Sequence, residues 1–446
     1  MTGTFRSLAI RNYRLWFVGA LVSNVGTWMQ RTAQDWLVLT ELTDHDAFAV
    51  GITTALQFGP MLVVGPLAGV LVDRLPARRL LAITQVLQAT LGLALGVLVL
   101  SGLAQLWMVY GFALLLGVVT AVDNPARQTF VGELVDSPHL SNAVALNAAS
   151  FNGARMIGPA VAGLSIAAVG TGWVFVVNAV SYAAVLASLR LMRASELHAT
   201  ARSARDRNGF REGLRYVAGR PDVMAILVMV FLIGTFGLNF AIFTSTMARI
   251  EFSRNADGYG LLSSILAIGS LVGALGSARR SRPRIRTIVL ASAGFGIFCA
   301  VAALMPGYWT FALALVPIGL CAMTITTSAN AYVQSTTPPA LRGRVMALYM
   351  AVFAGTTLLG APVVGAVAAV AGPRWAVGVA AAAGILAAMV GAGWWAVQQH
   401  VRVRRPPGSR WLLTLETDAE RTSPERRETR EDLRDALTTA EATTSR

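Results

Sequence analysis

Apolar stretches long enough to cross a lipid bilayer recur along almost the whole chain, and this recurrence constrains the fold more than any other feature. A membrane-spanning helix needs about 20 mostly apolar residues. Twelve stretches reach that length, near residues 15–39, 49–72, 80–100, 105–122, 142–169, 172–192, 223–248, 258–278, 287–305, 308–332, 345–371 and 375–398. With 55% hydrophobic and 13% charged residues, the composition is that of a polytopic membrane protein. The sequence therefore predicts an all-α integral membrane fold with twelve transmembrane helices.

The distribution of arginines predicts the orientation of these helices. Cytoplasmic loops carry an excess of positive residues. The N-terminus and the links after the even-numbered stretches hold nearly all arginines outside the tail, whereas the opposite links hold only Arg249, Arg254 and Arg374. Both termini are expected in the cytoplasm, with the protein in the cytoplasmic membrane. The net charge of +14 is then a topology signal with affinity for anionic lipid headgroups, and not a sign of nucleic-acid binding.

The chain divides into two halves joined by an arginine-rich link. We expect an N-terminal six-helix bundle over residues 1–192, a cytoplasmic linker over 193–221, a C-terminal six-helix bundle over 222–400 and a largely disordered cytoplasmic tail over 401–446. Gly158 and Gly163 recur as Gly360 and Gly365. Transporters built from repeated six-helix halves bind substrate near the midplane between them.

A charged link, Gly-Val-Leu-Val-Asp-Arg-Leu-Pro-Ala-Arg-Arg, joins the second and third stretches over residues 69–79. It resembles the signature between helices 2 and 3 of major facilitator superfamily transporters, with Pro76 in place of the usual glycine. Residues 125–135, 142–155 and 341–346, together with Trp28 and Trp36, resemble the transmembrane effector subfamily of drug and siderophore exporters. The resemblance covers about residues 5–400.

The resemblance implies a conformational latch in the charged link, which begins at Gly69. In the family, the loop acid lies against the N-terminus of helix 11, where unpaired N–H groups favour an anion. Asp73 would take this role, and Arg74 or Arg78 would pair with Asp123 at the cytoplasmic end of helix 4. Such contacts form only when the halves close on the cytoplasmic side. The alternative is that these charges are solvated and only enforce topology.

Polar residues on the first predicted helix indicate a transport pathway. Asn24, Trp28, Arg31 and Asp35 share one face at about 100° per residue. A charge at the bilayer centre costs about 2.5–3.5 kcal/mol, so such residues usually face a cavity. Asp35 is the leading candidate for a proton carrier, with Arg31 one turn away to balance its charge. Alternatively, the two form a static ion pair near the outer interface.

The fifth predicted helix adds further candidates. Arg155 lies mid-span with Asn152 on nearly the same face, and we assign Arg155 to proton coupling and Asn152 to the substrate cavity. Gly158, Pro159 and Gly163 resemble a helix 5 motif of antiporters, in an incomplete form. The motif favours export over import.

On the seventh predicted helix, Phe236, Asn239, Phe243 and Met247 share a face, which would suit a bulky amphipathic ligand. An aromatic stripe of this spacing is also typical of packing or of lipid contact. We predict that Asn24, Trp28, Asn152, Phe236, Asn239 and Phe243 line the substrate cavity.

Catalysis is not expected. The four histidines fall in predicted loops or at a span end without metal-ligand spacing, and the chain has no lysine to complete a nucleotide-binding loop. We predict no metal and no cofactor. The sequence favours a monomeric secondary transporter that exports small amphipathic compounds by proton antiport. The alternatives are an importer or facilitator of a polar metabolite and, in another class, a membrane receptor or scaffold.

Overall fold

The computed structural model describes residues 3–198, 209–278, 284–398, 402–404 and 414–416, and the side chains of a few of these are not placed. Contacts divide the chain into two compact units, residues 1–388 and residues 389–446. In the second unit, strands β1 (Arg402–Arg404) and β2 (Thr414–Glu416) pair in antiparallel register. The rest of the predicted tail lies outside the described residues.

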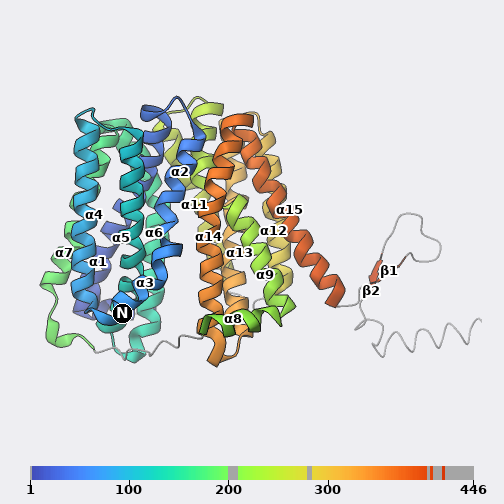
Figure 1. Cartoon of the computed structure of the whole chain (residues 1–446), viewed down its shortest axis with the longest axis horizontal. Helices are drawn as coiled ribbons and strands as arrows, with labels where there is room; N and C mark the ends of the chain where they lie inside the picture. The colour runs from blue at the N-terminus through green and yellow to red at the C-terminus, as the bar shows by residue number, and fades with distance from the viewer. Residues whose placement is uncertain (1–2, 199–208, 279–283, 399–401, 405–413, 417–446) are drawn as a thin grey trace, which may run out of the picture. The chain divides into compact units, whose positions relative to one another are not determined.

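The first half of the larger unit is a set of packed helices, here called the N-terminal bundle (Figure 1). It comprises η1 (Gly3–Ala9), α1 (Arg11–Leu37), η2 (Val38–Leu42), α2 (Ala47–Phe58), α3 (Pro60–Arg74), α4 (Ala77–Leu100), α5 (Leu106–Leu134), α6 (Ser137–Val169) and α7 (Thr171–Leu191). Helix α1 packs on α6 and α7, and α4 packs on α5 and α7. Near the start of α1, Tyr13 and Trp16 pack with Phe130 of α5 in a buried apolar cluster.

The second half, here called the C-terminal bundle, repeats this plan. It comprises α8 (Gly209–Ala218), α9 (Pro221–Leu232), η4 (Ile233–Gly237), α10 (Phe240–Thr246), η5 (Met247–Glu251), α11 (Ala256–Ala278), α12 (Ile285–Leu304), α13 (Tyr308–Thr336), α14 (Pro339–Ala371) and α15 (Pro373–Gln398), whose last residues belong to the second unit. The short η3 (Ala194–Glu196) lies instead against the N-terminal bundle, because Arg193 N donates to Asn12 Oδ1 and His198 N donates to the carbonyl oxygen of Glu133. Helix α13 packs on α11 and α12. Helix α8 packs on α14, where Glu212 forms an ion pair with Arg344.

The two bundles are related by a constant offset in sequence. Helices α13 and α14 begin and end 202 residues after α5 and α6. Gly170 and Gly372, which follow α6 and α14, both adopt a positive φ, of 84° and 99°. Glycine takes this conformation without steric cost, so each helix ends in the same way. The offset agrees with the recurrence of the helix 5 glycines.

The bundles meet along two seams, α2 against α14 and α6 against α11. We call the side where α1 begins and α8 lies the proximal side, and the side where α1 ends the distal side (Figure 1). On the distal part of the first seam, a Cβ atom on Gly365 would lie 2.6 Å from the carbonyl oxygen of Ala47 and 3.2 Å from the Cα of Gly51. Small residues of this kind let helix backbones approach closely.

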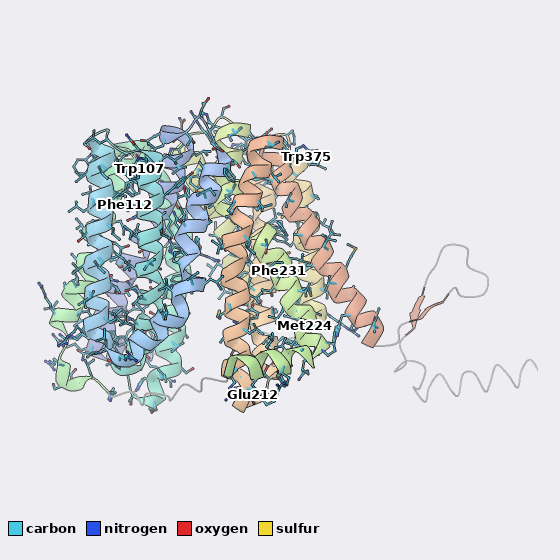
Figure 2. All side chains as sticks on the ribbon, viewed as in Figure 1. Trp107, Phe112, Glu212, Met224, Phe231 and Trp375 are labelled. Atoms are coloured by element: carbon cyan, nitrogen blue, oxygen red, sulfur yellow. The ribbon has the colours of Figure 1, made fainter. Side chains whose placement is uncertain are left out.

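Ten helices of the described residues are long and apolar enough to cross a membrane. Helices α1 and α6 reach 27 and 33 residues but are richer in polar groups. Large apolar side chains lie on the outside of the molecule, including Trp107, Met224, Phe231 and Trp375 (Figure 2). Exposed apolar surface over so many helices fits a lipid environment.

Helices lie over every predicted stretch, so the nearly all-helical fold is confirmed. Two stretches are broken. The predicted helix over 49–72 divides into α2 and α3 at Gly59, because Pro60 begins a new helix. The predicted helix over 223–248 contains two π-helical turns, η4 and η5, and leaves helical geometry at Leu238 and Asn239. Helix α5 extends well beyond residue 122, so Asp123 lies well inside the helix and not at its end.

Candidate functional site

Of the stripe predicted on α1, Asp35 is buried, whereas Asn24, Trp28 and Arg31 are partly exposed. Trp28 packs edge-on against Phe151 of α6, with ring centroids 5.8 Å apart. Its Cβ atom would lie 2.5 Å from a Cβ on Gly158. The glycine of the helix 5 motif therefore makes room for the indole, and this contact fixes α1 against α6.

Asp35 is buried, with 3% of the residue exposed. Its Oδ1 atom has no hydrogen-bond partner. The next residue, Trp36, stacks on Tyr259 of α11 with 5.8 Å between ring centroids and 15° between ring planes. The Tyr259 side chain also interacts with Thr32 and with the charge of Asp35. Asp35 thus lies where α1 of one bundle meets α11 of the other.

Arg31 does not form the static pair with Asp35 that the sequence left open, since no ion pair of 4.0 Å or less joins them in the described structure. The guanidinium carbon instead lies 4.3 Å from the ring centroid of Phe58 and 5.3 Å from that of Trp28. Aromatic faces attract a cation at these distances. The charge of Arg31 is held near Asp35 without neutralising it through a direct contact.

Arg31 also lines a small cavity inside the N-terminal bundle. The cavity has a volume of about 20 Å³, which is large enough for one water molecule. Gln30, Gln34, Gln57 and Tyr182 line it as well. The Gln57 amide donates to the Gln34 side-chain carbonyl at 3.3 Å. The interior of this bundle is therefore polar next to Arg31.

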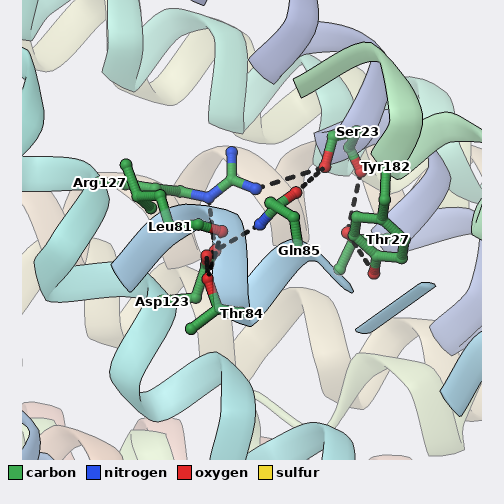
Figure 3. A network of polar contacts seen from close by, with 8 residues as sticks. All are labelled: Ser23, Thr27, Leu81, Thr84, Gln85, Asp123, Arg127 and Tyr182. Atoms are coloured by element: carbon green, nitrogen blue, oxygen red, sulfur yellow. Dashed lines mark hydrogen bonds and ion pairs between the residues drawn. The ribbon is translucent and has the colours of Figure 1, made fainter. Parts of the chain in front are cut away.

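A second polar cluster surrounds Asp123 on α5 (Figure 3). The carboxylate accepts hydrogen bonds from Thr84 Oγ1 at 2.6 Å and Gln85 Nε2 at 2.8 Å, and it pairs with Arg127 Nε at 2.5 Å. Arg127 also donates to Ser23 Oγ of α1 at 3.3 Å. Asp123 and Arg127 are both buried, so their charges are matched inside the protein.

The pairing expected for the latch is absent from this structure, and it stays a prediction for the state in which the halves close on the cytoplasmic side. Asp123 pairs with Arg127 on its own helix, four residues away, and not with Arg74 or Arg78. Arg74 is exposed, and Arg78 donates to the carbonyl oxygen of Leu189 at 2.5 Å. Arg127 reaches the Asp123 carboxylate because the two residues lie four apart on one helix. Arg74 and Arg78 lie elsewhere on the N-terminal bundle.

Other parts of the latch stay predictions. Gly69 is partly buried in α3. The side chain of Asp73 lies outside the described set, so its expected contact with the helix that begins at Pro339 is not tested. The sequence analysis did not identify Arg127 as a functional residue, because Arg127 was expected in a loop. The spacing of four residues between Asp123 and Arg127 could have indicated the pair.

On α6, Arg155 reaches toward the other bundle. Its Nη2 atom lies 3.9 Å from Met323 Sδ on α13. The Asn152 amide donates to the carbonyl oxygen of Ala148 at 2.9 Å, so it is occupied by its own helix. Pro159 lies within α6, and its carbonyl oxygen would be 2.7 Å from a Cβ on Gly260.

The predicted stripe on the seventh helix does not persist as a regular face, because η4 and η5 change the helical repeat. Asn239 donates to the carbonyl oxygen of Thr235 at 2.7 Å. Phe243 is buried and packs edge-on against Phe240. Phe236 is partly buried. These residues contact their own bundle, and their part in a substrate cavity stays a prediction.

The distal side carries a larger cavity, of about 500 Å³, between the ends of α1 and α6 and the start of α11. Trp36, Thr40, Arg249 and Asp257 line it. Nearby, Arg249 Nε donates to His45 Nε2 at 3.0 Å. This hydrogen bond joins the link before α2 to η5 and therefore crosses from one bundle to the other.

In the part of the chain that the structure covers, no group of three or more His, Cys, Asp or Glu side chains could hold a metal ion. Cys299 and Cys321 are buried and free.

Two helical bundles that meet along close seams, with charged residues buried inside them, are the architecture of a multi-pass membrane transporter. The chain belongs to the transmembrane secretion effector family of the major facilitator superfamily, whose model matches residues 2–404.

Named relatives are transporters as well. The chain is 24% identical over 341 residues to the staphyloferrin A transporter of Staphylococcus aureus, covering 76% of this chain and 85% of the relative. It is 30% identical over 343 residues to the multidrug efflux pump Tap of Mycolicibacterium fortuitum, covering 73% and 82%.

Solved transporters share the fold at low sequence identity. A bacterial homologue of the iron transporter ferroportin, in an inward-facing state, superposes with a TM-score of 0.66 at 15% identity, covering 86% of this chain and 98% of that one. A bacterial homologue of the lysosomal transporter Spinster gives 0.65 at 12% identity, covering 89% and 99%.

Proposed function

We propose that this protein is a proton-coupled exporter of small amphipathic compounds that works by alternating access in the cytoplasmic membrane. Twelve helices cross the bilayer, with both termini and the proximal side in the cytoplasm. Helices α1 and α6 add to the ten apolar helices and bring the number to twelve, because both pack among those helices. The arginine-rich proximal links contact anionic lipid headgroups, and one monomer contains the whole pathway.

The contacts between bundles support an inward-facing state. The glycine contacts in which backbone meets backbone across the bundles join α6 to α11 and α2 to α14 near the distal ends. On the proximal side, Arg74 is exposed and Arg78 is bound within its own bundle. A cycle of alternating access would open the distal seams and close the proximal side, where Gly69, Asp73 and the link arginines would act as the latch.

The observation that supports this proposal most strongly is the burial of Asp35, whose Oδ1 atom has no hydrogen-bond partner. A buried ionised carboxylate without hydrogen-bond donors is strongly unfavourable, and a proton on Asp35 would remove that unfavourable charge. The residue lies at the junction of α1 and α11, directly beside the distal seam. Opening that seam would change the surroundings of the carboxyl group, and Arg31 and Arg155 would compensate its charge when the proton leaves.

The direction and the substrate class are supported by the relatives. The named relatives include a multidrug efflux pump and a staphyloferrin A transporter. In this chain, the mixed aromatic and polar surroundings of Trp28, Asn24 and Asn152 suit amphipathic compounds. Phe236, Asn239 and Phe243 would reach the same cavity from the other bundle if the helix rearranges around η4.

The test uses the purified full-length protein in proteoliposomes with an imposed pH gradient and ethidium as an amphipathic probe. We expect the wild type to accumulate ethidium against its gradient and Asp35→Asn to lose accumulation while it still equilibrates the probe. Asp136→Asn, an exposed proximal acid, is the matched control. Full accumulation by Asp35→Asn would overturn the assignment. A wild type that only equilibrates the probe would support the facilitator instead.

A further inference from the structure

Among the contacts that join the bundles on the distal side is a hydrogen bond that depends on the protonation of one histidine. Arg249 Nε carries a proton and donates it to His45 Nε2 at 3.0 Å. The Nε2 atom must therefore offer a lone pair. The ring proton then resides on Nδ1, which lies 3.4 Å from Asp44 Oδ1. In this arrangement the imidazole is neutral, because a protonated ring has no acceptor atom.

We propose that His45 is a second proton-binding site of the transporter, and that a proton on its Nε2 atom releases the distal contact between the bundles. The inference rests on the alternating access proposed above. With a proton on His45 Nε2, the hydrogen bond from Arg249 Nε could not form. Two N–H groups would face each other instead, and they would belong to two cations about 3 Å apart. The distal contact would lose a bond and gain repulsion, so acid on that side would favour opening.

The charges around His45 agree with this role. Asp44 precedes it and stabilises a charged ring once the contact with Arg249 has opened. Asp46 is engaged at the start of α2, where it accepts from Phe48 N at 2.8 Å. On the opposite bundle, Glu251 pairs with Arg374.

The remaining charges of the facing segment are Arg254 and Asp257. Arg254 lies over the ring of Tyr308, and Asp257 lines the distal cavity beside Arg249. In the described structure, Glu251 and Arg254 interact with other residues. Across the seam, Arg249 therefore donates to His45. Asp257 can hold Arg249 after the seam opens.

The location gives protons access. The His45 side chain is 39% exposed, and the neighbouring cavity of about 500 Å³ is lined by Arg249. His45 also adopts a φ of 61°, which is uncommon for a residue other than glycine. Such strained residues concentrate at functional and switching positions. Histidine is the side chain that proteins use most often as a pH-dependent switch.

The experiment measures opening directly and does not depend on transport. Spin labels are placed at Leu103→Cys and Leu304→Cys, two exposed positions beside the distal ends of α4 and α12, with Cys299 and Cys321 replaced by Ala. The background is Asp35→Asn, so that a proton on Asp35 cannot cause the response. Between pH 8 and pH 5, we expect the open-to-closed ratio to rise about tenfold or more, as the loss of a hydrogen bond to a charged group implies.

His45→Gln is the central variant, because the amide oxygen still accepts from Arg249 but the side chain does not titrate. We expect its label distances to stay closed at both pH values. Arg249→Met, which has no donor, should be open at both, and His139→Gln, on the proximal side, should respond like the background. A pH response that survives in His45→Gln would overturn the proposal. An intact response, together with failure of the wild type to accumulate ethidium under a pH gradient, would count against the proposed function alone.

Discussion

Gly163 of α6 faces Gly260 of α11 so closely that a Cβ atom on Gly163 would lie 3.0 Å from the Cα of Gly260 and 2.6 Å from the carbonyl oxygen of Ala256. The equivalent contact on the other seam joins Gly365 to Gly51. Both pairs lie near the distal ends of their helices, so the two bundles meet there backbone to backbone.

Enlarging Gly163 should therefore open the distal seam. In Gly163→Ala the new methyl group meets backbone atoms of α11, and overpacking of this kind costs about 1–3 kcal/mol. We expect faster reaction of Thr40→Cys, in the distal cavity, with a membrane-impermeant maleimide. Gly153→Ala on the same helix is the control, because a Cβ there meets no atom within 4 Å. Equal rates in both variants would argue against a sterically closed seam.

Removing one member of the buried pair should destabilise the N-terminal bundle. Asp123→Asn leaves the Arg127 guanidinium buried without its counterion, and breaking a buried ion pair costs about 3–5 kcal/mol. The measurement is thermal unfolding in detergent. Asp123→Asn combined with Arg127→Gln should recover much of the loss, since no uncompensated charge is left. A double variant as unstable as the single one would contradict this account.

An exposed pair provides the reference for that measurement. Arg193 and Glu196 form an ion pair 3.0 Å long with both side chains largely in solvent. Pairs of this kind contribute about 0–1 kcal/mol, so Glu196→Gln should leave the unfolding temperature nearly unchanged.

The packing of α1 against α7 should depend on the absence of a side chain at Gly26. A Cβ there would lie 2.2 Å from Asn178 Oδ1 and 2.4 Å from Ser181 Oγ. Gly26→Ala would displace Asn178, whose amide donates to Gln30 at 2.5 Å, and lower stability by about 1–3 kcal/mol. Gly111→Ala on α5 meets no atom within 4 Å and should be neutral or stabilising by up to about 1 kcal/mol. If Gly111→Ala lowered the unfolding temperature more than Gly26→Ala did, the packing argument would be wrong.

Arg155 should matter to coupling more than to stability. No ion pair with a described acid engages it, and its Nη2 atom contacts Met323 across the bundles. We expect Arg155→Gln to reduce gradient-driven ethidium transport about tenfold or more, the effect of losing roughly 1.4 kcal/mol, with unfolding temperature little changed. Arg155→Lys, which keeps the charge, should retain part of the activity. Comparable loss in both variants would assign the role to guanidinium shape instead of charge.

Much of the fold follows from the sequence because hydrophobic length fixes where helices lie. The predicted stretches correspond to observed helices, and the 202-residue repeat appears in the ends of α5, α6, α13 and α14. The helix ends are less accurate where polar residues continue a helix past the apolar run. Asp123 shows this: α5 continues to Leu134, so a residue expected at the end of a helix lies well inside one and is buried.

The side-chain partners were harder to predict, because they depend on contacts between helices. Periodicity placed Trp28, Arg31 and Asp35 on one face, but it did not show that Phe58 would hold the guanidinium. The stripe through Asn239 assumed an unbroken α-helix. Two π-helical turns interrupt that helix, and the sequence carries no simple signal for them.

The backbone contacts between Gly51 and Gly365 and between Gly163 and Gly260 affect how fast the bundles can close again on the distal side. A contact made by glycines orders no rotamers when it forms, so closing it again loses no side-chain entropy. Each return of the bundles to this arrangement requires only that two smooth surfaces meet in register, and repeated cycles can reseal the far side of the membrane without a search among side-chain conformations.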